Sequence, residues 1–488
     1  MKRRLYQNYI LNSIYQASIL IIPLLLTPYV YKVLGVELIG QYSFTRSVVA
    51  YYTMFAAAGS NVYAQREIAY RKNDKPNRSI VFWEIVIIRF LLVLFSLIIY
   101  IPIAFGNSKY IILWFIQSLD IIAVFVDITW FFQGLEQFGK ITVRNIIIRI
   151  AVMISVFAFV NSKKDFWIYV LIYSLSNVLG QLWMWFDALK LLDKPCFDKI
   201  NLKRHVKGIV SLVIPQIAIQ IYLVLDKTMI EIITGDSKQT GYYEMAQMFQ
   251  RIGVSLVTAF GTVTASRVAI LKSNSESDEI KKLINQSFQI VILFGIPMAM
   301  GLASISSVFI PLYLGNDSAP IISLLRYLCP LIFIIGLSNV SGLQYMVPMG
   351  MQNFMTTSTL IGLLANMIMN ALLIPQYAAR GAVYASVISE FIVLAIQIIY
   401  VRSIIQWKEQ GIHFLRGVVC GVFMSALLEI TKRIWQTQNS FCLVVFMIAA
   451  GVVSYMILQF VFGNDLLRQL LQYILRFITP KGVQKCEK

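Results

Sequence analysis

The stretch IVFWEIVIIRFLLVLFSLIIYIPI (residues 80–103) decides the fold of this chain. It carries only two charges, Glu84 and Arg89, and a helix of about 20 apolar residues is long enough to cross the hydrocarbon core of a membrane. The chain as a whole is also rich in apolar residues: 58% of its 488 residues are apolar and 14% are charged, whereas a soluble protein carries about 25% charged residues. We therefore expect an all-α, polytopic membrane protein.

The same length criterion predicts about fourteen transmembrane helices. No loop between them exceeds about twenty residues, so neither face has room for a separate catalytic domain. The predicted spans are residues 9–33, 41–63, 80–103, 110–130, 142–160, 166–189, 209–233, 242–266, 286–311, 320–346, 356–375, 381–402, 414–430 and 441–462.

The basic residues predict which loops face the cytoplasm. An even number of spans puts both termini on one side, where the loops and termini hold 28 Lys and Arg residues against 8 in the other loops. Cytoplasmic loops are enriched in Lys and Arg, so we expect both termini in the cytoplasm. Topology and attraction to anionic lipids then account for most of the net charge of +18, and no nucleic-acid partner is expected.

A weak internal repeat divides the chain into halves. The stretches IGQYSF (39–44) and TGYYEM (240–245) lie 201 residues apart, close to the length of six helices with their loops. Six is even, so the halves insert in the same orientation, as in transporters built from parallel repeats. We expect two pseudo-symmetric six-helix lobes and two extra C-terminal helices. The predicted domains are the lobes 1–195 and 208–402, the added helices in 414–462 and a cytoplasmic amphipathic tail, 464–488.

Polar and cationic residues recur at helical spacing inside several predicted spans. A charge at the centre of a helix costs ~2.5–3.5 kcal/mol on insertion scales and usually faces the bundle interior or water. A guanidinium can bind two phosphate oxygens at once, so an excess of arginines predicts an anionic substrate. Alternatively, an arginine side chain can reach up to the lipid headgroups. The candidate substrate-binding residues are Arg46, Arg251, Arg326, Ser43 and Gln247.

Three carboxylates in the spans, Asp127, Asp226 and Glu390, are candidates for coupling to H⁺ or Na⁺, although each could equally be the salt partner of a nearby basic residue. No metal site is predicted, because His205 and His413 fall in predicted polar loops. The stretch GLEQFGK (134–140) has the spacing of a phosphate loop, but Ile141 stands where a Ser or Thr would bind magnesium. We expect no cofactor and no nucleotide, so transport must draw on an ion gradient or the membrane potential.

Four stretches resemble the polysaccharide-exporter branch of the MATE-like flippase superfamily, the O-antigen and capsule repeat-unit flippases, over most of residues 1–400. This resemblance implies two lobes forming a V around a cationic cavity. It also implies alternating access that moves an undecaprenyl-diphosphate-linked oligosaccharide outward across the bacterial cytoplasmic membrane. The family's cavity arginines and acids correspond to Arg46, Arg251, Asp127 and Asp226. The stretches are TPYVYKVLGVELIGQYSF (27–44), YAQREIAY (63–70), WFFQGLEQF (130–138) and LDKTMIEI with GYYEMAQ (225–232, 241–247).

The sequence departs from the family pattern at Lys32, which replaces an arginine, at residues 264–267, which lack a proline, and in the loop 347–355, which lacks a basic residue. A peptidoglycan-precursor flippase remains an alternative, but it would be expected to carry more arginines on the first helix. A MATE-like cation or drug antiporter would favour a cavity of carboxylates and aromatics. An enzyme is not expected, because a membrane glycosyltransferase or polymerase needs a large outer loop. The expected partners are the lipid-linked oligosaccharide, membrane lipids, and a polymerase and chain-length regulator of the same pathway.

The predicted topology can be tested by labelling single cysteines in whole cells, in a cysteine-free background. Positions 75, 200 and 485 should be protected from an impermeant thiol reagent because they are expected in the cytoplasm, whereas positions 163 and 436 should react. Modification at position 200 would contradict the fourteen-helix topology.

Overall fold

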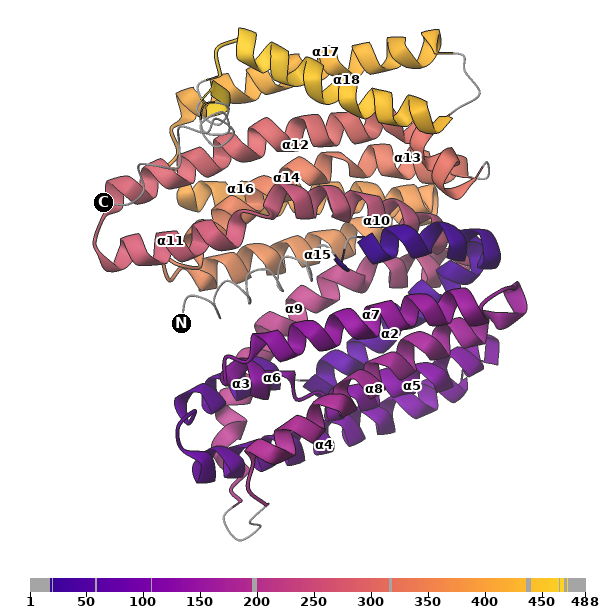
Figure 1. Cartoon of the computed structure of the whole chain (residues 1–488), viewed down its shortest axis with the longest axis vertical. Helices are drawn as coiled ribbons and strands as arrows, with labels where there is room; N and C mark the ends of the chain where they lie inside the picture. Colours follow the sequence, from indigo (N-terminus) through magenta and orange to yellow (C-terminus); the bar gives the residue numbers. More distant parts are fainter. Residues whose placement is uncertain are drawn as a thin grey trace, which may run out of the picture. The chain divides into compact units, whose positions relative to one another are not determined.

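The computed structural model describes residues 18–19, 21–57, 59–106, 108–194, 200–315, 318–435, 440–464, 466–468 and 472. These residues form helices joined by short turns, with no strand among them (Figure 1). In this part of the chain, 11 helices are long and apolar enough to cross a membrane, or 12 if the bent pair Ile21–Leu34 and Val36–Tyr70 forms one span. The protein is therefore an all-helical, multi-pass membrane protein.

The count of fourteen spans stays a prediction. It requires that α9 (Lys203–Thr234) and both members of the bent pair cross the membrane as well. Residues 9–17 and 20 of the first predicted span, and most of the amphipathic tail, lie outside the described residues.

The chain forms two compact units, and the first comprises Met1–Glu244 with Asn370–Ala379. Its central helix is α2, which contacts α4, α5 and α9, while α5 packs in turn against α8. A polar side chain on α2 can therefore meet partners from several helices. The helices of this unit include α2 (Val36–Ala57), α3 (Ser60–Tyr70), α4 (Lys75–Gly106), α5 (Ile111–Val126), α6 (Thr129–Gly134), α7 (Phe138–Phe159), α8 (Phe166–Leu191), α9, and the start of α10 (Ser237–Thr258).

The second unit comprises Met245–Met369 with Arg380–Lys488. It is built around its longest helix, α12, which contacts α13, α14, α17 and α18. A π-helical segment, Val340–Met346, continues α14. The helices of this unit include α11 (Gly261–Ser273), α12 (Ser277–Leu314), α13 (Ala319–Leu328), α14 (Pro330–Asn339), α15 (Gln352–Tyr377), α16 (Ala379–Val401), α17 (Trp407–Ile434) and α18 (Ser440–Val461).

Two stretches that carry the family resemblance pack against each other. YAQREIAY lies in α3 and WFFQG lies in α6, and these two helices are in contact. A Cβ added to Gly134 would lie 2.8 Å from the carbonyl oxygen of Gln65. Trp130, Phe131 and Phe132 are fully buried in a core that also contains Phe82. The aromatic stretch is therefore part of the packing core of the first unit.

A buried carboxylate connects α4 to the start of α9. Glu84 has no exposed surface and accepts a hydrogen bond from the backbone nitrogen of Asn201 at 2.7 Å. Its other oxygen pairs with Arg204 and lies 2.8 Å from Nε2 of His205. His205, which the sequence places in a polar loop, is thus buried on α9, because the Glu84 carboxylate and the Tyr63 hydroxyl, 2.8 Å from Nδ1, satisfy both ring nitrogens.

The glycines of the sequence repeat mark the point where α2 and α10 approach each other. A Cβ added to Gly40 would lie 1.7 Å from the carbonyl oxygen of Ser237, and one added to Gly241 would lie 2.1 Å from that of Val36. Both distances are far below van der Waals contact, and the atoms that a Cβ would meet belong to the backbone. Only glycine fits at either position without a shift of one helix.

We predict that Gly40→Ala and Gly241→Ala each lower the thermal unfolding temperature by several degrees, because forcing extra atoms into a packed contact costs ~1–3 kcal/mol. Gly411→Ala is the matched control, since nothing lies within 4 Å of its added Cβ. It should not lower the unfolding temperature, because alanine has a higher helix propensity than glycine. Equal behaviour of the three variants in a thermal unfolding assay would contradict the close approach.

Candidate functional site

A cluster of polar side chains lies among α2, α5 and α8 in the first unit. Asp120 of α5 accepts hydrogen bonds from Ser174 Oγ at 2.9 Å and from Asn177 Nδ2 at 2.7 Å, both on α8. Each carboxylate oxygen of Asp120 therefore has a neutral donor. Tyr42 and Arg46 of α2 complete the cluster.

Three tyrosine rings form an aromatic wall beside this carboxylate. The rings of Tyr42 and Tyr169 have centroids 5.2 Å apart, and those of Tyr169 and Tyr173 are 5.0 Å apart. The guanidinium carbon of Arg46 lies 5.9 Å from the centroid of Tyr42, within the range of a cation–π interaction. The sequence prediction missed these tyrosines, although the spacing of four residues between Tyr169 and Tyr173 places both on one helix face.

Arg46 is exposed although it lies in a helix of a candidate span. It interacts electrostatically with Asp120 and Glu244, but it forms no ion pair within 4.0 Å in the described part of the chain. A guanidinium in a span needs water or a counter-charge. The carboxylates attract it at longer range, so its N–H donors remain able to bind an anionic ligand.

Ser43 takes part in a separate network that connects α2, α9 and α10. Its Oγ donates a hydrogen bond to Glu244 Oε2 at 2.8 Å, and the same oxygen pairs with Lys227 of α9. Ser43 and Glu244 occupy equivalent positions of the repeat, 201 residues apart. Equivalent positions of α2 and α10 therefore contact each other, as their glycines do. Because Ser43 is buried and holds Glu244, its role in the structure is to position that carboxylate.

Asp127 has a structural role at the break between α5 and α6. Its Oδ1 accepts hydrogen bonds from the backbone nitrogen of Thr129 at 2.9 Å and from the hydroxyl of that residue. Its Oδ2 lies 3.8 Å from the guanidinium of Arg89, which also donates to the Asp127 carbonyl oxygen at 2.7 Å. Arg89 is buried, so it pairs inside the unit and does not extend to the lipid headgroups.

The other two candidate coupling carboxylates lie elsewhere. Asp226 of α9 is buried and accepts hydrogen bonds from the Tyr243 hydroxyl and from Asn370 Nδ2, the latter at 2.7 Å. Glu390 lies half-buried on α16 in the second unit. The structure thus places Asp127, Asp226 and Glu390 in three separate environments.

In the second unit, Arg251 is exposed on α10 and donates a hydrogen bond to Gln247, one turn earlier. Gln247 is 201 residues after Arg46, so Arg251 follows the equivalent of Arg46 by one helical turn. Arg326 lies apart from this pair. Its Nε donates to the Ser306 hydroxyl at 3.2 Å, and it lines a cavity of about 560 Å³ with residues of α12 and α17, including Glu429.

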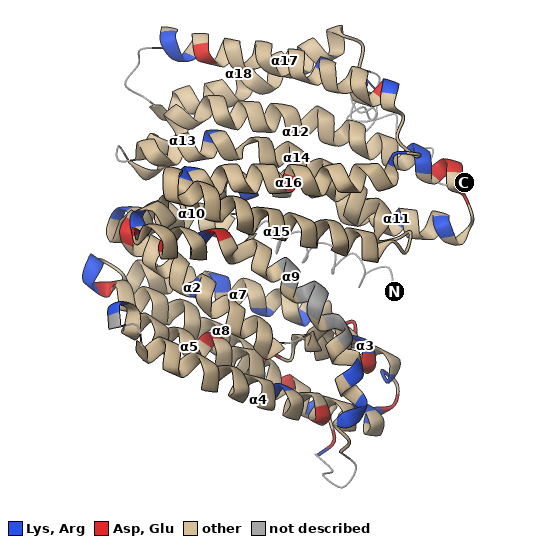
Figure 2. Ribbon diagram, turned by 180° about the vertical axis from the view of Figure 1, so that it is seen from behind, with Lys and Arg blue, Asp and Glu red and all other residues tan. Residues whose placement is uncertain are grey.

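Most of the other charged residues lie away from the middle of the helices (Figure 2). Figure 2 shows Lys, Arg, Asp and Glu mainly at the helix ends and turns of each unit, with long uncharged stretches between them. The exposed arginines Arg46 and Arg251 are exceptions that packing does not explain. They are the strongest candidates for contact with an anionic ligand.

The chain matches known proteins over most of its length. The sequence profile of the family described as "Polysaccharide biosynthesis protein" covers residues 5–265. A protein of Escherichia coli (strain K12) named "Putative O-antigen transporter" is 24% identical over 418 residues, which is 82% of this chain and 98% of the relative.

Solved structures share the fold. The lipid II flippase MurJ, in an inward closed conformation, matches with a TM-score of 0.75 and 17% identity, over 94% of this chain and 99% of its own. An inward-facing multidrug resistance MATE family transporter of the MOP superfamily matches with a TM-score of 0.57 and 14% identity, over 79% of this chain and 97% of its own. The resemblance seen in the sequence is confirmed: with a profile match over more than half of its residues, the chain belongs to the polysaccharide biosynthesis protein family.

Proposed function

We propose that this protein is a flippase for cell-surface polysaccharide assembly. It moves undecaprenyl-diphosphate-linked oligosaccharide repeat units from the inner to the outer leaflet of the bacterial cytoplasmic membrane. Family membership and the O-antigen transporter relative support the substrate class. The proposed process is transport, with no bond made or broken by the protein, and both termini lie in the cytoplasm.

The observation that carries this proposal is the exposed guanidinium of Arg46 beside an aromatic wall. A diphosphate headgroup needs donors with the planar geometry that arginine supplies. Sugar rings offer apolar faces, and tyrosine combines a flat apolar ring with a hydroxyl that can hydrogen-bond. Arg46 with Tyr42, Tyr169 and Tyr173 therefore suits a ligand that joins phosphate to sugar. Arg251, exposed on the equivalent helix of the repeat, is the candidate phosphate-binding guanidinium of the second unit.

The mechanism that we propose is alternating access, in which the two lobes expected from the repeat move relative to each other. The division into two compact units, each with its own packing core, supports it. The helices α10 and α15 pass from one unit to the other, so they are the elements that such a motion would bend.

A flippase for a peptidoglycan precursor is the second candidate, favoured by the fold shared with the lipid II flippase. Both candidate substrates are lipid diphosphates and would use the same arginines. They differ in their sugars, so competition between the two lipids for transport distinguishes the candidates.

We predict that Arg46→Ala and Arg251→Ala each reduce export of the cognate glycan about tenfold or more while the protein remains in the membrane. A hydrogen bond to a charged group contributes ~1.5–3 kcal/mol, and each 1.4 kcal/mol is a factor of about ten in affinity. Arg251→Lys should restore part of the export, since it keeps the charge but loses the planar fork. Export can be measured as surface glycan in a complemented deletion strain.

Arg402→Ala is the control for this experiment, because Arg402 is exposed and basic but lies in the loop before α17, outside the candidate site. Export that is indifferent to the changes at Arg46 and Arg251 would show that these side chains do not bind the substrate.

The energy source gives a further prediction. With no nucleotide site expected, the proposed source is an ion gradient or the membrane potential. Outward movement of negative charge is favoured by a negative cell interior at ~2.3 kcal/mol per charge per 100 mV, so about 5 kcal/mol for two charges. We predict that collapsing the potential stops flipping. Asp226→Asn should also change the dependence of flipping on pH or sodium, and Asp127→Asn should in addition lower thermal stability, because Asp127 pairs with Arg89.

Proteoliposomes with a fluorescent diphosphate-linked oligosaccharide allow this measurement with and without an imposed potential or ion gradient. Equal flipping rates in all conditions would mean that the protein is a passive scramblase and would remove the coupling role of these carboxylates.

A further inference from the structure

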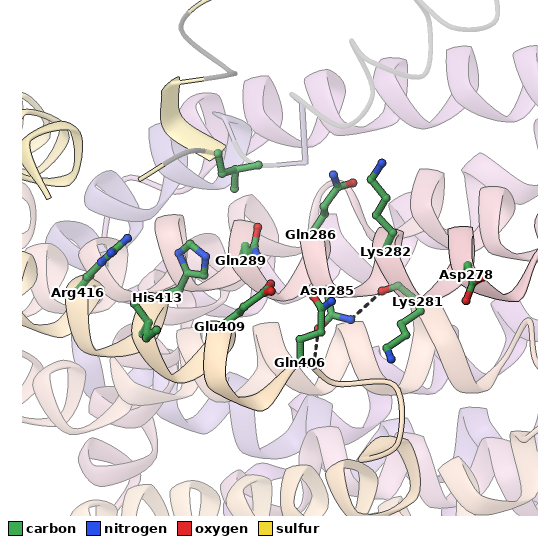
Figure 3. Close-up of a pocket in the computed structure, with 12 residues that line it drawn as sticks. Asp278, Lys281, Lys282, Asn285, Gln286, Gln289, Gln406, Glu409, His413 and Arg416 are labelled. Carbon is green, nitrogen blue, oxygen red and sulfur yellow. Dashed lines mark hydrogen bonds between the residues drawn. The ribbon is translucent and has the colours of Figure 1, made fainter. Parts of the chain in front are cut away.

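A polar cavity of about 700 Å³ lies in the second unit, where α12 and α17 begin (Figure 3). Its lining residues come from these two helices, the turn before α17 and Leu466. None of them belongs to the candidate substrate site. The cavity therefore needs an explanation of its own.

Two rows of polar side chains line the cavity along neighbouring helices. Each row has spacings of four and three residues, which place its three members on one helix face. Figure 3 shows the two rows side by side. The rows are Lys282, Gln286 and Gln289 on α12, and Glu409, His413 and Arg416 on α17.

The base of the cavity is held by Asn285, which is 2% exposed. Its Oδ1 accepts a hydrogen bond from the backbone nitrogen of Gln406 at 2.9 Å, and its Nδ2 donates to the carbonyl oxygen of Ile404 at 2.8 Å. Gln410 of α17 donates to the same Oδ1 at 3.2 Å. One buried side chain thus fixes the turn and α17 against α12, so the cavity is formed before any ligand binds.

The position of the cavity corresponds to the headgroup level of a membrane. α12 has 38 residues, so it is ~57 Å long, whereas the hydrocarbon core is about 30 Å thick. The helix is therefore longer than the core, and its charged start, with Asp278, Glu279, Lys281 and Lys282, is the end that we place beyond the hydrocarbon. Phe414 and Leu415, next to the lining residue His413, are exposed apolar side chains of the kind that contacts acyl chains.

The charge of the lining suits one phosphate. Lys281, Lys282 and Arg416 oppose Asp278 and Glu409, which leaves one positive charge before His413 is counted. The side-chain amides of Gln286 and Gln289 can donate hydrogen bonds to phosphate oxygens. Basic pockets between transmembrane helices on the cytoplasmic side are suited to anionic lipid headgroups.

We propose that this cavity binds the phosphodiester of an anionic phospholipid that is not transported. Lys282 and the glutamine amides of α12 bind the phosphate, and Arg416 adds positive charge from the other end of the lining (Figure 3). By the distribution of basic residues, the leaflet concerned is the cytoplasmic one. The bound lipid connects α17 to α12 and stabilises the attachment of the last two helices to the second unit. This site goes beyond the proposed function, because it assigns a second, structural lipid.

The test is thermal unfolding of the purified, delipidated full chain titrated with short-chain phosphatidylglycerol or phosphatidylcholine. A ligand that binds the folded state raises the unfolding temperature, so we expect a rise with phosphatidylglycerol and little change with phosphatidylcholine. In the double variant Lys282→Gln, Arg416→Gln, the concentration needed for half of the effect should rise at least tenfold. Lys408→Gln, an exposed lysine of α17 outside the cavity, is the control and should change it less than twofold.

Arg416 also donates a hydrogen bond to the Gly463 carbonyl oxygen at 3.4 Å, so its loss could disturb folding. The single variant Lys282→Gln avoids this and should still weaken the phosphatidylglycerol effect severalfold. An unchanged response in this variant would overturn the proposal. So would an equal response to inorganic phosphate, which would mean a free-phosphate site, or displacement of phosphatidylglycerol by lower concentrations of undecaprenyl diphosphate, which would assign the cavity to the substrate.

Discussion

The absence of water from the hydrocarbon core is the constraint on which the rest of this structure depends. Every backbone N–H and C=O in that layer must find a partner within the protein, which is why the described residues are helical almost throughout. The same constraint acts on charged side chains, since a charge in that layer needs an opposite charge or access to water. Where a helix breaks, other groups must hydrogen-bond the freed backbone N–H and C=O. Where a charge lies inside a span, a counter-charge or a hydrogen-bond partner must stabilise it. These added interactions differ from helix to helix in this protein.

The breaks illustrate this. Asp127 ends α5, and its side chain accepts the backbone N–H of Thr129 at the start of α6, while Arg89 and Trp130 donate to its carbonyl oxygen. The break is repeated 201 residues later between α13 and α14, where Pro330 begins the second helix at the position equivalent to Thr129. Similarly, α2 ends at Ala57 and α3 begins at Ser60, while α10 ends at Thr258 and α11 begins at Gly261. The repeat detected from two short motifs therefore also sets where helices are interrupted.

The sequence predicts the apolar spans well because hydrophobic length is a local property: the expected helix 80–103 lies inside α4, and 286–311 lies inside α12. It does not predict which charges pair, because pairing joins residues far apart in the chain. Asp120 and Asp127 both fall in the expected helix 110–130, yet the break at Asp127 gives them unrelated partners. The sequence also does not identify the tyrosines beside Arg46 as site residues. Tyrosine in an apolar stretch is as typical of a membrane interface as of a binding site.

The contacts of Arg89 and Arg46 differ, and this difference separates a structural arginine from a candidate binding residue. Arg89 and Arg46 both lie on helices of candidate spans, but Arg89 is buried against a carboxylate and a carbonyl oxygen, so its charge is already used in holding α4 to α5. Arg46 is exposed, and its carboxylate neighbours Asp120 and Glu244 are occupied by Ser174, Asn177, Ser43 and Lys227. Because other donors hydrogen-bond these two carboxylates, they attract the Arg46 guanidinium without forming an ion pair with it. A charge kept in this condition inside a span costs free energy, and the binding of an anionic ligand, as proposed above, would offset part of that cost.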